Sequence, residues 1–257
     1  IRGAADYQAL AAADLVIEAV FEEMEIKRKV FAKLDEVCSE RAILATNTSS
    51  LDVDAIAEET KDPSRVLGLH FFSPANIMKL VEVVRPATVS ANVLSSSLDA
   101  VKRIGKIGVV VGVCDGFVGN RMLYAYRRQA DFLLEEGALP AQVDRALREF
   151  GMAMGPYQIG DVAGLDIGWR IRKRQAATRS KELRYSPIAD RLCEMGRFGQ
   201  KTGAGWYRYE KGSRTSLPDP EVDALVRAVS AELGVERREI PDDEIVLRCF
   251  GALVNEG

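Results

Sequence analysis

The fold of this chain is most strongly constrained by short apolar runs that alternate with helical segments between residues 15 and 111. Continuous, branched apolar runs, typical of buried strands, occupy residues 15–20, 42–45, 66–69 and 107–111. Segments of helical character occupy residues 24–38, 52–59 and 91–104. Strands that alternate with helices predict a parallel sheet covered by helices, and such sheets bind ligands beyond the carboxyl ends of their strands.

His70, the only histidine in the chain, lies at or just past the end of the run at 66–69. Residues 79–84 predict another strand, and a turn around Pro74 and Asn76 would fold it back so that Glu82 comes within reach of the imidazole. Histidine exchanges protons near neutral pH, and a carboxylate on one ring nitrogen fixes its tautomer and stabilises its charged form. Spacing alone favours a plainer interpretation, a core histidine and a surface glutamate.

Polar residues also follow two other predicted strands. Glu22 comes after the run at 15–20, and Ser49 lies in the polar turn at 47–50 that follows the run at 42–45. Because the carboxyl ends of parallel strands meet at one edge of a sheet, we expect Glu22, Ser49 and His70 to converge. Three polar residues at one edge indicate a site more strongly than any one of them.

A dinucleotide-binding fold opens with a strand, a GxGxxG loop and a helix, because the glycines let a pyrophosphate approach the helix N-terminus. This sequence contains no such loop, since the glycine-rich residues 199–205 lack both the spacing and the strand-to-helix setting. We therefore expect either that the sequence is a fragment without the front of such a fold, or that it does not bind a dinucleotide.

Composition excludes several classes of protein. The 257 residues are 47% hydrophobic and 28% charged, which suits a globular protein of one or two domains with a large core. The net charge of −3 gives no field that would attract nucleic acid. Four scattered cysteines predict neither a metal site nor disulfides and suggest a reducing compartment. The sequence has no apolar run of membrane-spanning length and no signal peptide.

After residue 113 the pattern becomes helical. Asp115 is a suitable N-cap for a helix over 116–136, and Asn120 in its second turn could point at the sheet edge. Further helices are predicted at 140–150, 221–233 and 242–256, with a glycine-rich loop that passes into a helix at 151–168. The basic stretch 169–181 fits a solvated face or a dock for an anionic ligand or a neighbouring domain. Residues 197–209 predict a loop packed under the helices, and 211–220 predict a linker.

Six segments carry a resemblance to the 3-hydroxyacyl-CoA dehydrogenase family, most of all to the dehydrogenase part of multifunctional β-oxidation enzymes. They are DLVIEAVFEEMEIKRKVFAKLDE, ILATNTSSL, GLHFFSPANIMKLVEVV, DGFVGNRML, GPYQIGDVAGLDIGW and GRFGQKTGAGWYRY. The resemblance implies an α/β Rossmann-like parallel sheet, incomplete at its N-terminal half, followed by an all-α domain. It implies that residues 1–113 are the C-terminal part of an NAD-binding domain and 114–210 the helical dehydrogenase domain. Residues 211–257 would be a linker and the start of a second helical domain.

The resemblance also implies roles for individual residues. His70 matches the catalytic histidine and Glu82 the glutamate paired with it. Ser49 matches a serine near the substrate oxygen and the nicotinamide, and Asn120 an asparagine that holds the substrate. Glu22 and Lys27 match positions that contact the cofactor, and Lys27 also lies near the acyl-CoA in the family. Ser73 occupies a position where many members have an asparagine that contacts the nicotinamide.

The implied activity is NAD-dependent oxidation of an (S)-3-hydroxyacyl-CoA to a 3-ketoacyl-CoA, with NAD as cofactor and no metal. A fused or associated enoyl-CoA hydratase is an expected partner, and the expected compartment is the cytoplasm of a bacterium or the peroxisome of a eukaryote. Two alternatives stay open. One is a related dehydrogenase acting on a small 3-hydroxy acid, and the other is a catalytically incompetent fragment that binds NAD weakly.

Overall fold

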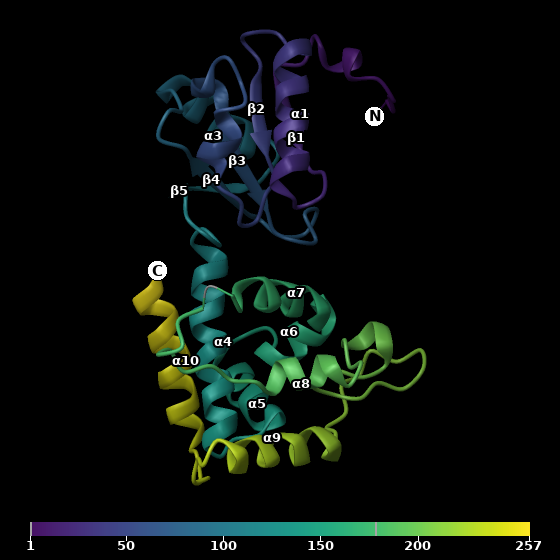
Figure 1. Cartoon of the computed structure of the whole chain (residues 1–257), viewed down its shortest axis with the longest axis vertical. Coiled ribbons are helices and arrows are strands. Elements are labelled where there is room, and N and C mark those ends of the chain that lie inside the picture. Colours follow the sequence, from purple (N-terminus) through teal and green to yellow (C-terminus); the bar gives the residue numbers. More distant parts are fainter. Residues whose placement is uncertain (1, 178) are drawn as a thin grey trace. The chain divides into compact units, whose positions relative to one another are not determined.

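The computed structural model describes residues 2–177 and 179–257 and divides the chain into two compact units (Figure 1). Unit 1 is Ile1–Arg121 and unit 2 is Met122–Gly257. Each unit has its own hydrophobic core. Helices α9 (Pro220–Glu232) and α10 (Asp242–Glu256), which the resemblance assigns to a linker and a further domain, share the core of unit 2. A separate domain at 211–257 stays a prediction.

Unit 1 is a five-stranded sheet in the order β1-β2-β3-β4-β5, with helices packed on it. Its strands are β1 (Leu15–Glu18), β2 (Ile43–Thr46), β3 (Val66–Phe71), β4 (Leu80–Arg85) and β5 (Ile107–Gly112). Its helices are η1 (Tyr7–Leu10), α1 (Met24–Val37), α2 (Val53–Ala57), η2 (Pro63–Arg65) and α3 (Ala91–Arg103). All strand pairs are parallel except β3–β4, which is antiparallel. The predicted α/β fold followed by a helical part is confirmed.

Alternation along each strand sorts its side chains between two apolar clusters. Leu44 and Val66 pack with Phe31 of α1, whereas their chain neighbours Ala45 and Leu67 belong to a second cluster that contains residues of β4 and α3. This period of two is what a pleated strand imposes. The central strands are therefore buried on both faces, which explains why they appear in the sequence as unbroken apolar runs.

Unit 2 is built from helices on one large core, and the first of these helices begins in the last residues of unit 1. They are α4 (Gly119–Glu136), α5 (Pro140–Phe150), α6 (Pro156–Ala163), α7 (Leu165–Gln175), α8 (Ile188–Glu194), η3 (Gln200–Thr202), α9 (Pro220–Glu232) and α10 (Asp242–Glu256). Helix α8 has no counterpart in the sequence prediction. The loop at 197–209 is packed as predicted: Asp161 of α6 accepts hydrogen bonds from the backbone N–H groups of Trp206 and Tyr207 and from the Tyr209 hydroxyl.

The start of α4 differs from the sequence prediction. The helix begins at Gly119 rather than at residue 116, and Asp115 does not cap it. Residues 115–118 form turns, in which Phe117 adopts a left-handed backbone conformation with φ of 48°. The first backbone N–H groups instead donate to the carboxylate of Glu82, a residue that sequence-local reasoning could not connect to this helix. Among the described residues, no helix is both long enough and apolar enough to cross a membrane.

Candidate active site

His70 and Glu82 face each other across the β3–β4 hairpin. The two residues are direct partners in the antiparallel register, so their side chains leave the sheet on the same face. The Nδ1 atom of His70 lies 2.7 Å from Oε2 of Glu82, and both side chains are buried, with 8% and 2% of their surface exposed. The structure thus brings together the pair that the sequence places within reach, and its catalytic role stays a prediction.

The second oxygen of Glu82 holds the start of α4. Oε1 accepts hydrogen bonds from the backbone N–H groups of Val118 at 3.0 Å and Gly119 at 2.7 Å. Burial raises the pKa of Glu82, but the hydrogen bonds from His70, Gly119 and Val118 outweigh it and hold the pKa below its usual value. Glu82 is therefore an anion at neutral pH, since hydrogen bonds to the charged form favour it.

The imidazole is held in an aromatic setting. The rings of Phe72 and Phe117 lie 4.6 and 5.8 Å from the His70 ring, centroid to centroid. Because the Glu82 carboxylate can only accept a hydrogen bond, the contact requires a proton on Nδ1, and in the neutral imidazole this leaves the lone pair on Nε2. This tautomer suits a base, since Nε2 can accept a proton while Glu82 balances the charge that forms.

A second polar cluster brings Glu22, Ser49 and Asn120 together. Oε1 of Glu22 accepts hydrogen bonds from the hydroxyl of Thr48 at 2.6 Å and from the backbone N–H and hydroxyl of Ser49 at 2.8 and 3.1 Å. The side-chain amide of Asn120 donates to the backbone oxygen of Ser49 at 3.4 Å. Burial acts to raise the pKa of Glu22, but the bonds from Thr48 and Ser49 and the charge of Lys27 hold it below its usual value.

Sequence reasoning missed a buried ion pair beneath this cluster. The ammonium of Lys27, of which 1% of the side chain is exposed, donates to both carboxylate oxygens of Glu18 at 2.8 and 3.0 Å. Thr46 donates to the same carboxylate, and Glu22 lies 3.5 Å from the ammonium. The available signal was a glutamate inside an otherwise apolar strand, because such a charge is buried only when it is paired. A direct contact of Lys27 with an acyl-CoA stays a prediction.

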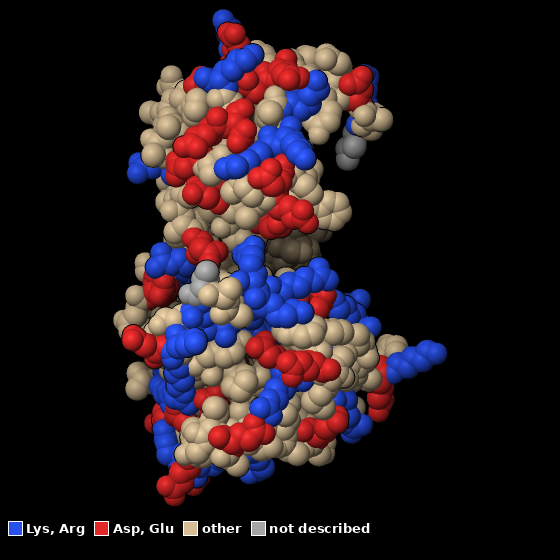
Figure 2. Space-filling model, in the orientation of Figure 1, with Lys and Arg blue, Asp and Glu red and all other residues tan. Residues whose placement is uncertain are grey.

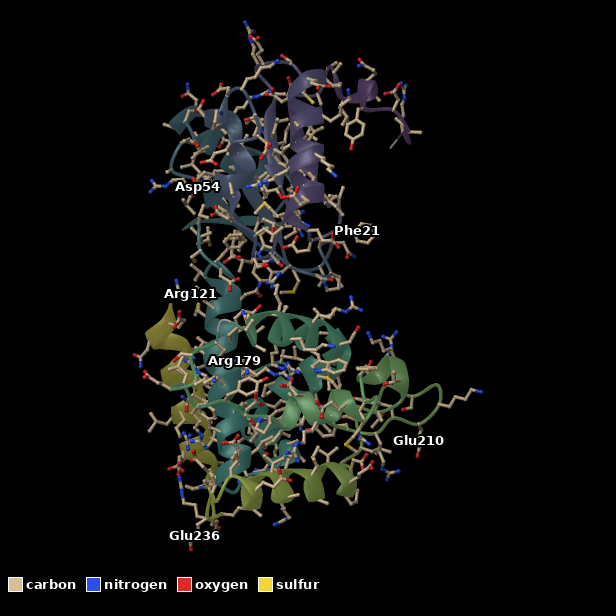
Figure 3. The ribbon with its side chains drawn as sticks, viewed as in Figure 1. Phe21, Asp54, Arg121, Arg179, Glu210 and Glu236 are labelled. Atoms are coloured by element: carbon tan, nitrogen blue, oxygen red, sulfur yellow. The ribbon has the colours of Figure 1, made fainter. Side chains whose placement is uncertain are left out.

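Other side chains at this edge of the sheet are exposed. Phe21, labelled in Figure 3, follows the carboxyl end of β1 and has 78% of its surface exposed. Ser73 lies exposed in the loop between β3 and β4. Among the described residues, no group of three or more histidine, cysteine, aspartate or glutamate side chains could hold a metal ion.

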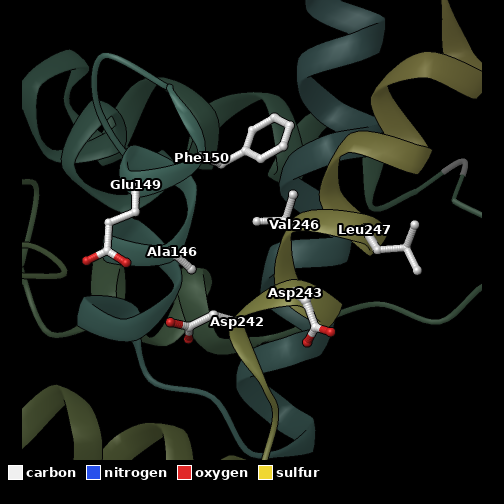
Figure 4. A pocket seen from close by; sticks show the side chains of 7 residues that line it. All are labelled: Ala146, Glu149, Phe150, Asp242, Asp243, Val246 and Leu247. Carbon is white, nitrogen blue, oxygen red and sulfur yellow. The ribbon is translucent and has the colours of Figure 1, made fainter.

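Two further features lie in unit 2. A groove of about 460 Å³ between α5 and α10 is lined by apolar and acidic side chains such as Phe150, Val246 and Asp242 (Figure 4). The first part of the basic stretch, residues 169–175, falls on α7, where Figure 2 shows Lys and Arg side chains gathered. Several of these cations are already engaged: Arg172 pairs with Asp190, and Lys173 lies over the ring of Trp169.

Comparison with known proteins gives the family of the chain. Residues 1–114 match the model of the 3-hydroxyacyl-CoA dehydrogenase NAD-binding domain, and residues 116–209 match that of the 3-hydroxyacyl-CoA dehydrogenase C-terminal domain. The peroxisomal bifunctional enzyme of Homo sapiens is 51% identical over 259 residues, which cover 96% of this chain and 36% of that protein. A peroxisomal fatty acid beta-oxidation multifunctional protein of Arabidopsis thaliana is 38% identical over 260 residues, covering 100% of this chain and 36% of that protein.

Solved structures agree with these matches. The 3-hydroxybutyryl-CoA dehydrogenase of Escherichia coli superposes with a TM-score of 0.76 at 39% identity, covering 83% of this chain and 46% of that one. The dehydrogenase part of multifunctional enzyme 1 from C. elegans gives a TM-score of 0.71 at 34% identity, covering 98% and 56%. The chain spans about a third of the length of the curated relatives described above. With both parts of the dehydrogenase matched in order, the chain belongs to the 3-hydroxyacyl-CoA dehydrogenase family.

Proposed function

We propose that this chain carries the site for NAD-dependent oxidation of (S)-3-hydroxyacyl-CoA to 3-ketoacyl-CoA in fatty acid β-oxidation. The observation that carries the proposal is the buried His70–Glu82 pair, with 2.7 Å between Nδ1 and Oε2, at the sheet edge where polar side chains converge. A family match alone would not supply a base, whereas this pair supplies one that is oriented, desolvated and electrostatically supported.

His70 removes the proton of the C3 hydroxyl at Nε2. Glu82 keeps the proton of the neutral imidazole on Nδ1 and stabilises the imidazolium that forms, and in the reverse direction His70 returns the proton to the forming alkoxide. Glu82 itself stays ionised, because its second oxygen is held by two backbone N–H groups. NAD⁺, when bound, supplies the acceptor for the hydride from C3.

Ser49 and Asn120 would fix the position of the substrate. The hydroxyl of Ser49 donates to Glu22, which leaves its lone pairs to accept a hydrogen bond. The amide of Asn120 is anchored on the backbone of the turn that carries Ser49. Positioning of this kind contributes several kcal/mol to lowering a barrier.

The residues present fit the nicotinamide end of the cofactor. Glu22 and Ser49 form an ordered polar cluster on the catalytic edge, and Ser73 lies exposed in the loop that follows His70. We propose these residues, with Lys27 behind them, as the cofactor contacts. The sequence has no GxGxxG loop for the pyrophosphate, so weak NAD binding by this polypeptide stays a prediction, which isothermal titration giving a micromolar Kd would contradict.

Formation of NADH tests the proposal. We expect the protein with saturating NAD⁺ to oxidise (S)-3-hydroxybutyryl-CoA, to leave the R enantiomer unchanged, and to lose the activity in the His70→Gln variant. Activity on free 3-hydroxybutyrate but not on its CoA thioester would favour the alternative, a dehydrogenase for small 3-hydroxy acids. Activity on neither compound would count against the proposed oxidation by this chain and would favour the other alternative, a catalytically incompetent fragment.

The relatives suggest a setting for this activity. Their names describe bifunctional and multifunctional enzymes, and we propose that this chain works as one part of such an enzyme. An associated enoyl-CoA hydratase stays a prediction, as does a bacterial cytoplasmic location. In a eukaryote we propose the peroxisome, because the relatives named above are peroxisomal.

A further inference from the structure

The loop between the two catalytic strands, residues 72–79, is held by a cation that the proposed mechanism does not use. The ammonium of Lys106 donates to the backbone oxygens of Ala75 and Met78, the latter at 2.7 Å. These oxygens belong to a single helical turn, in which the backbone oxygen of Pro74 accepts hydrogen bonds from the N–H groups of Ile77 and Met78, each at 3.0 Å. A cation at the carboxyl end of a turn satisfies carbonyl groups that have no partner within the turn.

The backbone of Lys106 is itself fixed. Helix α3 ends in a motif in which the N–H of Gly105 donates to the oxygen of Lys102 and the N–H of Lys106 donates to the oxygen of Val101. Directly after it, the N–H of Ile107 donates to the oxygen of Lys79 at the end of the loop. Lys106 therefore joins a rigid helix end to the 72–79 loop.

This loop presents two apolar side chains to solvent. Ile77 has 68% and Met78 has 41% of its surface exposed. Exposed apolar residues are ordinary singly, but these two are adjacent on one ordered turn. The loop joins the carboxyl end of β3 to β4, so it lies at the same sheet edge as His70 and Ser49. At about 3.3 Å per residue, Met78 is within roughly 13 Å of Glu82 along the chain.

We propose that the 72–79 loop is the contact for the acyl chain of the substrate, with Ile77 and Met78 as the apolar surface and Lys106 as the residue that positions them. The inference rests on the proposed function and adds to it the residues that contact acyl chains extending beyond C4. A fatty chain leaving the reacting carbon next to His70 would meet this surface and remove it from water.

Two substrates of different length test the contact. We expect Ile77→Ser and Met78→Ser to lower kcat/KM for 3-hydroxydecanoyl-CoA roughly tenfold, through KM, and to leave 3-hydroxybutyryl-CoA within about twofold of wild type. Ile77→Leu should retain the wild-type ratio between the two substrates. Ile104→Ser, which replaces an isoleucine with 57% of its surface exposed in the same unit, is the matched control and should leave the ratio unchanged.

The role of Lys106 is tested in the same way. Lys106→Met should raise KM for the long substrate about fivefold more than for the short one, and should weaken binding of 3-ketodecanoyl-CoA by isothermal titration to the same degree. Lys106→Arg can still donate to both carbonyl groups and should recover most of the loss, while Lys102→Met on α3 controls for the loss of charge. The pH profile of kcat should not move, because the His70–Glu82 pair is untouched.

Each result bears on one of the two proposals. Equal losses on both substrates, or unchanged chain-length dependence in the serine variants, would overturn the acyl-chain contact. A lower melting temperature in Lys106→Met with an unchanged ratio would show a purely structural lysine and would overturn its positioning role. A wild-type protein inactive on both thioesters would instead count against the proposed function itself.

Discussion

Replacing Glu82 with glutamine probes the catalytic pair with the smallest change in shape. In the wild-type protein each oxygen of the Glu82 carboxylate has its own partner. Oε2 lies 2.7 Å from Nδ1 of His70, and Oε1 accepts hydrogen bonds from the backbone N–H groups of Val118 and Gly119. An amide cannot do both, because one of its ends is a donor. If the amide oxygen keeps the two backbone groups, its NH₂ points at Nδ1 and forces the imidazole proton onto Nε2. In that tautomer Nε2 carries a hydrogen and can no longer accept the proton of the substrate hydroxyl.

The size of the effect follows from the charge. Unit charges 2.7 Å apart interact by roughly 6 kcal/mol at an effective dielectric constant of about 20, an upper bound on what Glu82 contributes to stabilising the imidazolium. Allowing about a third for solvent and for residual hydrogen bonding leaves about 4 kcal/mol, which corresponds to roughly a thousandfold in kcat at 1.36 kcal/mol per decade.

Steady-state NADH formation from (S)-3-hydroxybutyryl-CoA measures this. We expect the Glu82→Gln variant to lose about three decades of kcat while KM changes less than about threefold, since the lost interaction exists in the transition state. Glu58→Gln, at an exposed position with the same change of charge, should match wild type. A kcat within tenfold of wild type, or a variant that changes only KM, would refute the reasoning. Thermal melting would separate a loss of catalysis from a loss of folding.

Four further outcomes are expected. His70→Gln should abolish turnover yet bind 3-ketoacyl-CoA with nearly wild-type affinity by titration calorimetry; residual turnover above about 1% would remove His70 from its role as the base. Gly119→Ala places a Cβ 2.8 Å from the Phe72 ring and should cost roughly 1–3 kcal/mol in the free energy of unfolding by urea titration, and a neutral variant would contradict the close packing. Lys27→Met leaves a buried carboxylate without its cation and should cost roughly 3–5 kcal/mol in the same assay, whereas a loss under 1 kcal/mol would show that water reaches the pair. Burial raises the pKa of Asp144 to about 6, so the folded chain holds this proton more tightly than the unfolded one; the resulting stability is complete below about pH 4 and is lost as pH rises through about 6. The melting temperature of unit 2 should therefore fall between about pH 4 and 6, and a slope unchanged in Asp144→Asn would exclude this carboxyl as the cause.

Much of the fold could be predicted from the sequence because it depends on local patterns of residues. Apolar runs and helical periodicity predicted the strands of the unit 1 sheet and the helices that cover it, since the spacing of apolar residues shows whether an element is buried on one face or on both. The predicted turn at Pro74 also put Glu82 within reach of His70. This prediction was possible because the two residues are only twelve positions apart and belong to one hairpin. Helix boundaries were less accurate, as the late start of α4 shows, because capping there depends on a distant partner.

The sequence by itself determined which segments form the sheet and which histidine stands at its edge. Only the tertiary structure decided what each charged group does there. Lys27 pairs with Glu18, which lies nine residues before it. Glu82 accepts hydrogen bonds from two backbone N–H groups that lie 36 and 37 residues after it, and Lys106 binds a loop about 30 residues before it. Such contacts have no period in the sequence, because a hydrogen bond depends on where packing brings two atoms and not on how far apart they lie along the chain.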